Sequence, residues 1–195
     1  MVNIMMFIII FIFILSITAI LKLEKHEVIY VRSSIDNRDY LVRDLPDKDE
    51  AANLLATTRK NIFILTNHLY ENRDTKYKDN KENIEQLYSK IQNVIINESS
   101  EDSSYTSYSV NKGEQIVFCL RSKHNNEFHD INLIMYVVLH EMAHVGCKEY
   151  GHTPLFKKIF AFYTLVAINL GLYTKMDFNN DPTEYCGLMI SESII

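Results

Sequence analysis

Residues 140–156 read HEMAHVGCKEYGHTPLF, and this stretch carries the strongest structural signal in the chain. It opens with an H-E-x-x-H pentad formed by His140, Glu141 and His144 with two residues between. On a helix, residues four apart lie on one face, so both imidazoles can bind one Zn²⁺ while Glu141 lies beside them as a general base. The stretch therefore predicts a helix that carries a metal site.

A third histidine, His152, follows the pentad after seven intervening residues. Gly151 allows the chain to turn sharply before it, and Thr153-Pro154 after it is typical of a helix start. A helix, a turn and a histidine at the start of the next helix can supply three ligands and leave the fourth tetrahedral position to water, as in catalytic zinc sites. Cys147 is an alternative ligand, in a closed structural site.

The residues before the pentad favour this interpretation. At about 100° per residue, His140 and His144 point roughly opposite the apolar stripe of their helix, so one side would pack on a core while the other faces a site. The stripe consists of Ile131, Ile134, Met135, Val138, Leu139 and Met142.

The same stretch resembles the zincin-like metallopeptidases of the SprT and WLM (Wss1-like) type. In that family an H-E-x-x-H helix is followed by a further histidine in a G-H-x-x-x-F or similar setting, which Gly151, His152 and Phe156 match. The resemblance implies that His140, His144 and His152 bind zinc and that Glu141 is the catalytic base. It covers residues 130–170 and extends to small membrane-anchored proteins of large DNA viruses. The metzincin pattern is excluded, because Cys147 and Tyr150 stand where it needs glycine and histidine.

Composition bounds the class of protein. The chain has 195 residues, 47% of them hydrophobic, and a net charge of −5. This size suits one core, and the negative charge argues against a large nucleic-acid surface, which needs clustered lysine and arginine. Partners are expected to be a membrane and a protein or peptide substrate. The sequence indicates no oligomeric state.

The three cysteines are odd in number and widely spaced. This pattern argues against a disulfide framework and favours a reducing compartment. Cys119 and Cys186 are predicted to be small buried apolar residues.

Residues 4–21 read IMMFIIIFIFILSITAIL and carry no charge. Eighteen helical residues span about 27 Å, close to the hydrocarbon thickness, and the basic flank and cleavage site of a signal peptide are missing. We predict a single-pass anchor. Lys22, Lys25 and Arg32 follow it and no basic side chain precedes it, which places the catalytic domain in the cytosol.

The predicted fold class is α+β, with a zincin-like domain over residues 47–195 after a juxtamembrane linker or strand over 22–46. Asp47–Asn72 reads as a helix opened by a capping box with Glu50, and Asp79 opens a second helix. Asn97–Ser104 reads as an exposed loop that contains an N-glycosylation sequon at Asn97. The C-terminal tail, from Asp181 on, is expected to dock as a strand.

Two short strands are predicted over residues 105–110 and 115–121, joined by the turn signal Asn111-Lys112-Gly113-Glu114. The edge of such a hairpin can hold an extended peptide, although it can equally be plain scaffold. A helix follows the third histidine over residues 154–170.

The other histidines are expected to be structural: His68 a core or boundary residue, and His124 and His129 solvated loop residues. Tyr173, Tyr185 and Arg121 are the candidates for stabilising an oxyanion.

The sequence thus predicts a membrane-anchored zinc metallopeptidase. The alternatives are a non-catalytic membrane protein with a structural or vestigial zinc site, and a zinc hydrolase that cleaves a non-peptide amide.

Overall fold

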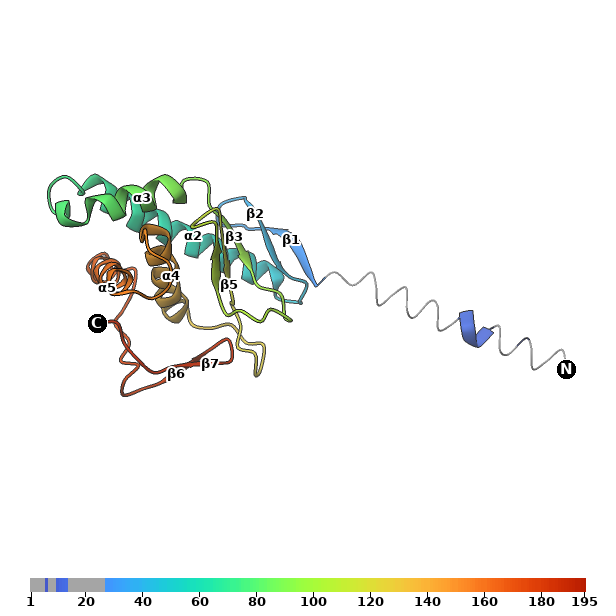
Figure 1. Cartoon of the computed structure of the whole chain (residues 1–195). Coiled ribbons are helices and arrows are strands. Elements are labelled where there is room, and N and C mark those ends of the chain that lie inside the picture. The colour runs from blue at the N-terminus through green and yellow to red at the C-terminus, as the bar shows by residue number, and fades with distance from the viewer. Residues whose placement is uncertain (1–5, 7–9, 14–26) are drawn as a thin grey trace.

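The computed structural model describes residues 6, 10–13 and 27–195 (Figure 1). The anchor predicted over residues 4–21 lies largely outside the described residues, as does the first part of the 22–46 linker. Within the described ranges, no helix is both long and apolar enough to cross a membrane.

From residue 27 on, the chain has the mixed α+β fold that the sequence predicts (Figure 1). The main helices are α2 (Lys48–Glu71), α3 (Lys81–Ile91), α4 (Ile131–Gly146) and α5 (Pro154–Asn169), and a short 3₁₀ turn, Lys78–Asn80, precedes α3. The strands are β1 (Val28–Arg32), β2 (Asp39–Arg43), β3 (Ile95–Glu98), β4 (Tyr108–Val110), β5 (Gln115–Phe118), β6 (Thr183–Tyr185) and β7 (Leu188–Ile190).

The sheet next to the metal helix has the strand order β3-β5-β4. β3 runs parallel to β5, and β4 pairs antiparallel with β5 in the register Ser109↔Ile116, which confirms the predicted hairpin. Gly113 in its turn has φ +105°, and a Cβ added there would lie 2.9 Å from Cγ1 of Val145 in α4. The hairpin turn therefore packs directly on the end of the metal helix.

Helix α4 lies in the core, in contact with α2, α3, α5 and β4. The sequence predicted one apolar stripe, but twelve of its sixteen residues are buried. The open side is narrower than expected because helices cover α4 from several directions. Along this helix only Ile131, Asn132, His140 and His144 keep partial exposure.

Two of the predicted helix starts are confirmed. The Thr153 hydroxyl accepts a hydrogen bond from the Phe156 N–H at 3.2 Å, and α2 begins directly after Asp47. The predicted capping box is wrong, because the Asp47 carboxylate binds the guanidinium of Arg121 instead, at 2.6 and 2.8 Å. Likewise α3 is preceded by Asn80 rather than by Asp79, and neither makes a side-chain cap.

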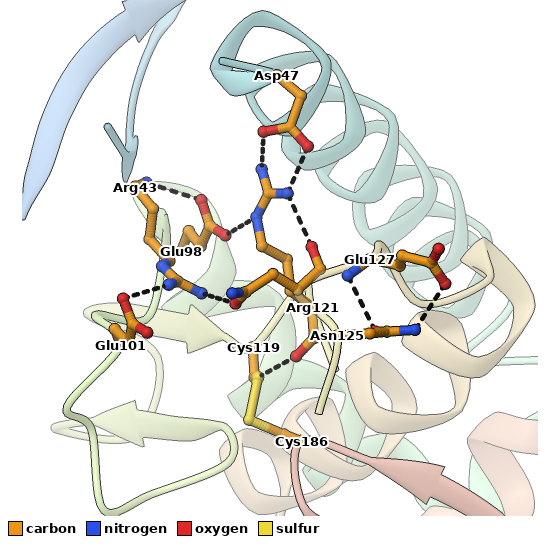
Figure 2. A network of polar contacts seen from close by, with 10 residues as sticks. Arg43, Asp47, Glu98, Glu101, Cys119, Arg121, Asn125, Glu127 and Cys186 are labelled. Carbon is orange, nitrogen blue, oxygen red and sulfur yellow. Dashed lines mark hydrogen bonds and ion pairs between the residues drawn. A yellow bond between two sulfur atoms is a disulfide. The ribbon is translucent and has the colours of Figure 1, made fainter. Parts of the chain in front are cut away.

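The loop predicted over 97–104 is wrong in its first part. Asn97 and Glu98 belong to β3 and are buried. Glu98 Oε1 accepts from Nε of Arg121 at 2.9 Å, and both side chains are 1% exposed (Figure 2). A polar sequence can form a buried strand when its charge is paired inside the fold, which composition alone does not reveal.

The prediction of unpaired cysteines is also wrong. Cys119 and Cys186 form a disulfide across a sequence separation of 67 residues, and Cys147 is free and buried (Figure 2). The three cysteines therefore consist of one disulfide-bonded pair and one free thiol. Only the tertiary structure brings the end of β5 next to the turn between β6 and β7.

The predictions for the other histidines have mixed outcomes. His68 lies at the core boundary as expected, with Nε2 3.1 Å from the Tyr77 hydroxyl, and His124 is exposed. His129 is not solvated: it is 9% exposed, and its Nε2 accepts the Cys186 N–H at 3.1 Å.

The C-terminal tail docks on the domain, but as a hairpin of two short strands rather than as the single strand that the sequence predicts. Strands β6 and β7 pair with each other as an antiparallel hairpin, which lies at the lower edge of Figure 1, away from α2 and α3. Beyond it, the Ile194 N–H donates to the Tyr136 hydroxyl on α4 at 3.2 Å. The chain end is thereby tied to the helix that carries the pentad.

Candidate metal centre

The three predicted ligands converge on one point. The Nε2 atoms of His140, His144 and His152 lie 3.1 Å, 3.2 Å and 3.1 Å from one another. Zinc bound tetrahedrally to imidazole nitrogens at about 2.0–2.1 Å requires its ligands to be about 3.3 Å apart, so the three nitrogens approximate one face of such a tetrahedron.

The donor chemistry also fits a cation. A neutral imidazole carries one N–H, so three Nε2 atoms in a closed triangle cannot all be satisfied by hydrogen bonds to each other. A divalent ion is the partner that satisfies three converging lone pairs together. The residues present therefore fit a zinc ion, with His140, His144 and His152 as the ones that would hold it.

The electrostatic environment keeps two of these imidazoles neutral. Burial, followed by the neighbouring imidazoles, lowers the pKa of His140 to about 3. Burial, His152 and Lys112 lower the pKa of His144 to about 4. A neutral imidazole is the form that binds metal.

Glu141 lies on the same helix, 5% exposed and lining the same cleft. Burial raises the pKa of this carboxyl to about 7. A carboxyl group with a pKa near neutrality is suited to accepting and releasing a proton.

Aromatic rings of α5 surround the histidines. The ring of Phe156 stacks on His144 with centroids 4.2 Å apart and meets His140 edge-on at 5.0 Å. Phe160 contacts His140 at 5.3 Å. The resemblance relied on Phe156 as a motif residue, and the structure gives that residue a role in fixing the orientation of two ligands.

The loop between the second and third ligands is held by Lys112, which the sequence analysis did not single out. Its ammonium group donates to the carbonyl oxygens of Cys147, Lys148 and Glu149 at 2.8 Å, 2.9 Å and 3.2 Å. Gln86 of α3 donates to the Cys147 carbonyl at 3.1 Å as well. These carbonyls follow the end of α4 and would otherwise lack helix partners.

His152, and not Cys147, lies with the two pentad histidines in the group of side chains that could hold a metal ion. Cys147 is fully buried and contributes its backbone carbonyl to the loop, whereas Nε2 of His152 reaches both pentad histidines. Cys147, the alternative ligand considered from the sequence, is therefore not part of this group.

The triad opens on a cleft of about 1220 Å³. One wall is β4 with the residues before it, and the other is the C-terminal hairpin. Residues from these walls that line the cleft include Ser107, Tyr108, Ser109, Tyr185, Leu188 and Ile190.

The three residues predicted as candidates for stabilising an oxyanion lie in different places. Tyr185 lines the cleft together with Glu141, and its hydroxyl lies 2.7 Å from Oγ of Ser107. Tyr173 does not line the cleft; its hydroxyl accepts the Met176 N–H at 3.1 Å. Arg121 is committed to Glu98 and Asp47 (Figure 2). Of the three, only Tyr185 is among the residues that line the cleft.

Ser107 was also missed by the sequence analysis. It accepts the Cys119 N–H at 3.2 Å and contacts the Tyr185 hydroxyl. Nothing in the local sequence distinguishes it or Lys112 from an ordinary loop residue, because their partners are 12 to 78 residues away.

Comparison with known proteins identifies the family. The model of the WLM domain matches residues 36–152. An uncharacterized protein of Acanthamoeba polyphaga mimivirus is 47% identical over 174 residues, which cover 89% of this chain and 88% of that protein. An uncharacterized protein of Invertebrate iridescent virus 6 is 42% identical over 69 residues, or 34% of this chain and 38% of that protein.

Among solved structures, Wss1 from Saccharomyces cerevisiae is similar with a TM-score of 0.44 and 22% identity, covering 65% of this chain and 86% of that one. A Wss1 mutant gives a TM-score of 0.46 at 22% identity, covering 68% and 91%. The family match spans more than half of the chain and includes all three histidines of the triad. The chain therefore belongs to the WLM domain family, a metallopeptidase family.

Proposed function

We propose that this protein is a zinc-dependent metallopeptidase that hydrolyses peptide bonds in the cleft beside α4. The observation that carries the proposal is the triangle of Nε2 atoms opening on that cleft, with Glu141 beside it. A zinc ion held there would supply Lewis acidity to a water molecule and to the scissile carbonyl.

Each of the surrounding residues then has a definite task. Glu141 accepts the proton of the attacking water and passes it to the leaving amine. The Tyr185 hydroxyl donates a hydrogen bond to the oxygen that becomes negative as the carbonyl is attacked. Burial raises the pKa of Tyr185, so it remains a phenol and can donate at neutral pH.

The wall formed by β4 suits an extended peptide. In the part of the chain that the structure describes, β4 pairs with β5 along one edge, and Tyr108 and Ser109 border the cleft. Addition of a substrate strand to a free edge supplies main-chain hydrogen bonds irrespective of side-chain identity. We propose that this edge aligns the substrate across the triad.

We also propose that residues 4–21 anchor the protein in a membrane as a single span. The net charge of −5 supports a protein or peptide substrate rather than direct nucleic-acid binding.

The test compares full-length wild-type protein in detergent with Glu141→Gln. We expect about one zinc per chain in both, and cleavage of denatured casein or a peptide library by the wild type alone, because the amide cannot accept the proton. Wild-type protein with full zinc and no cleavage would leave the non-catalytic zinc protein as the better explanation. Equal activity in Glu141→Gln would exclude Glu141 as the base.

A further inference from the structure

The disulfide joins the two walls of the proposed catalytic cleft. Cys119 directly follows β5, the partner of β4, while Cys186 lies in the turn between β6 and β7 with φ +52°. Cys186 is also the neighbour of Tyr185 in the chain. The bond therefore fixes the residue next to the proposed hydrogen-bond donor (Figure 2).

Two polar contacts of the β6–β7 hairpin with the rest of the domain come from Tyr185 and Cys186. The Tyr185 hydroxyl meets Ser107 Oγ at 2.7 Å, and the Cys186 N–H donates to His129 Nε2 at 3.1 Å. The Tyr185 ring packs on His129 with centroids 4.9 Å apart. These contacts depend on one another, because Ser107 itself accepts the Cys119 N–H.

Apolar burial holds the remainder of the hairpin weakly. Leu188 and Met189 are each 61% exposed, so β7 gains little from the hydrophobic core. Tyr185 and Cys186, by contrast, are each 3% exposed. The covalent link is thus the strongest restraint at the point where the hairpin contributes to the cleft.

We propose that the Cys119–Cys186 disulfide positions Tyr185 for the hydrolysis proposed above, so that oxidation switches the peptidase on and reduction switches it off. The inference rests on the proposed function. A dithiol reductant gives two electrons and two protons to the bond: the S–S bond breaks, two thiols form, and the reductant closes to its own disulfide. Cys119 is 5% exposed and borders a small pocket of about 160 Å³ beside Arg43 and Lys123, so this pocket is where a small reductant would approach the bond.

Reduction leaves the metal ligands untouched. His140 and His144 lie on α4, and His152 follows the loop whose carbonyls accept hydrogen bonds from Lys112 and Gln86, residues outside the β6–β7 hairpin. The expected consequence is a lower turnover number with zinc retained. If the disulfide only stabilised the fold, its reduction would instead cause the protein to lose zinc and activity together.

The test uses the full-length, zinc-loaded protein and a water-soluble phosphine, since thiol reductants bind zinc themselves. We expect kcat to fall about tenfold or more on reduction at unchanged zinc content, and to recover on reoxidation, because an oriented donor to an oxyanion is worth at least that much. The Cys119→Ser/Cys186→Ser variant is expected to have the low kcat of the reduced wild-type protein, with or without phosphine. Cys147→Ser, which changes the free thiol, is the control and keeps the response.

Two further measurements separate this inference from the proposed function. In Tyr185→Phe the donor is already absent, so reduction changes kcat less than about twofold. We expect amide hydrogen exchange of residues 183–190 to become faster on reduction. This measurement needs no substrate. Failure of the oxidised, zinc-loaded protein to cleave any peptide refutes the proposed function. The hydrogen-exchange measurement still tests whether the disulfide holds the segment that contains Tyr185. Unchanged exchange and unchanged kcat in the reduced protein, or loss of zinc on reduction, would overturn the inference.

Discussion

At the scale of single residues, the metal centre depends on three nitrogens that the chain brings within 3.2 Å of each other. Two come from one helix face, and local geometry alone places them together. The third, His152, is exposed, whereas His140 and His144 are half-buried, and it lies in the loop that borders the cleft. The proposed contribution of His152 to metal binding is therefore the one that substitution of a single ligand tests best.

Replacing the third ligand should release the metal. His152→Ala leaves two imidazoles, which is too few for tight zinc binding, so purified protein should fall well below about one zinc per chain. Metal content after dialysis is the measurement. His124→Ala, at an exposed histidine away from the triad, is the matched control. Zinc retained by His152→Ala and lost by Cys147→Ser would return Cys147 to the ligand set.

The phenol of Tyr185 should contribute to turnover and not to metal binding. Removing one oxyanion donor costs about 10²–10³-fold in kcat in enzymes where it has been measured, and we expect Tyr185→Phe to approach the lower value. Tyr173→Phe is the control, because the Tyr173 hydroxyl accepts a backbone N–H outside the cleft. Equal kcat in the two variants would remove Tyr185 from the mechanism.

At the scale of elements, the β4–β5 hairpin does more than supply a wall. Its turn packs on Val145 through Gly113, and Lys112 in the same turn binds three successive carbonyls of the loop that leads to His152. The spacing between the second and third ligands is thus maintained by a different element. A loop of seven residues would otherwise sample many arrangements.

Weakening this contact should loosen the metal site. Lys112→Met keeps the length of the side chain but removes its three donors, and we expect zinc affinity to fall about 10–100-fold, as for other groups that orient metal ligands. Lys112→Arg should restore part of the loss. Lys148→Met is the control in the same loop, because the Lys148 ammonium pairs with the exposed Glu82 on the surface. Competition with a zinc chelator measures the affinity, and equal values for Lys112→Met and Lys148→Met would contradict the role.

At the scale of the whole molecule, a buried ion network joins segments that are distant in sequence. Arg121, after β5, binds Glu98 of β3 and Asp47 before α2, while the Arg43 N–H of β2 donates to Glu98 at 2.8 Å (Figure 2). Burial raises the pKa of Glu98, and the Arg43 N–H and Arg121 oppose that effect. The network thus couples β2, β3, β5 and α2.

Removing its central cation should destabilise the fold. Arg121→Met leaves Glu98 buried without its partner, which costs about 3–5 kcal/mol in comparable sites. Adding Glu98→Gln should recover part of this free energy, since the uncompensated charge is gone while an acceptor for the Arg43 N–H remains. Urea unfolding of the single and double variants measures it. A change below about 1 kcal/mol for Arg121→Met would show that the network contributes little, as exposed ion pairs do.

The disulfide and the burial of the Asn97 sequon also change the arguments about the side of the membrane on which the domain lies. The Lys22, Lys25 and Arg32 bias still supports a cytosolic domain, but the argument from unpaired cysteines no longer does. Asn97 is 6% exposed within β3, so absence of a glycan there would not report the compartment. Protease accessibility in sealed vesicles is the measurement that does, and the anchor and its orientation stay predictions.

The sequence by itself predicted the helix with the pentad, the three candidate ligands, the candidate base and the β4–β5 hairpin, because each of these predictions depends on short-range periodicity or spacing. The i, i+4 geometry of a helix and the turn signal at Asn111–Glu114 act over a few residues and need no partner. Only the tertiary structure decided that Cys119 meets Cys186, that Glu98 is buried against Arg121, that Lys112 holds the ligand loop and that Tyr185 enters the cleft. Those contacts join residues 23 to 78 positions apart, and their energies come from desolvation and pairing that no local pattern encodes.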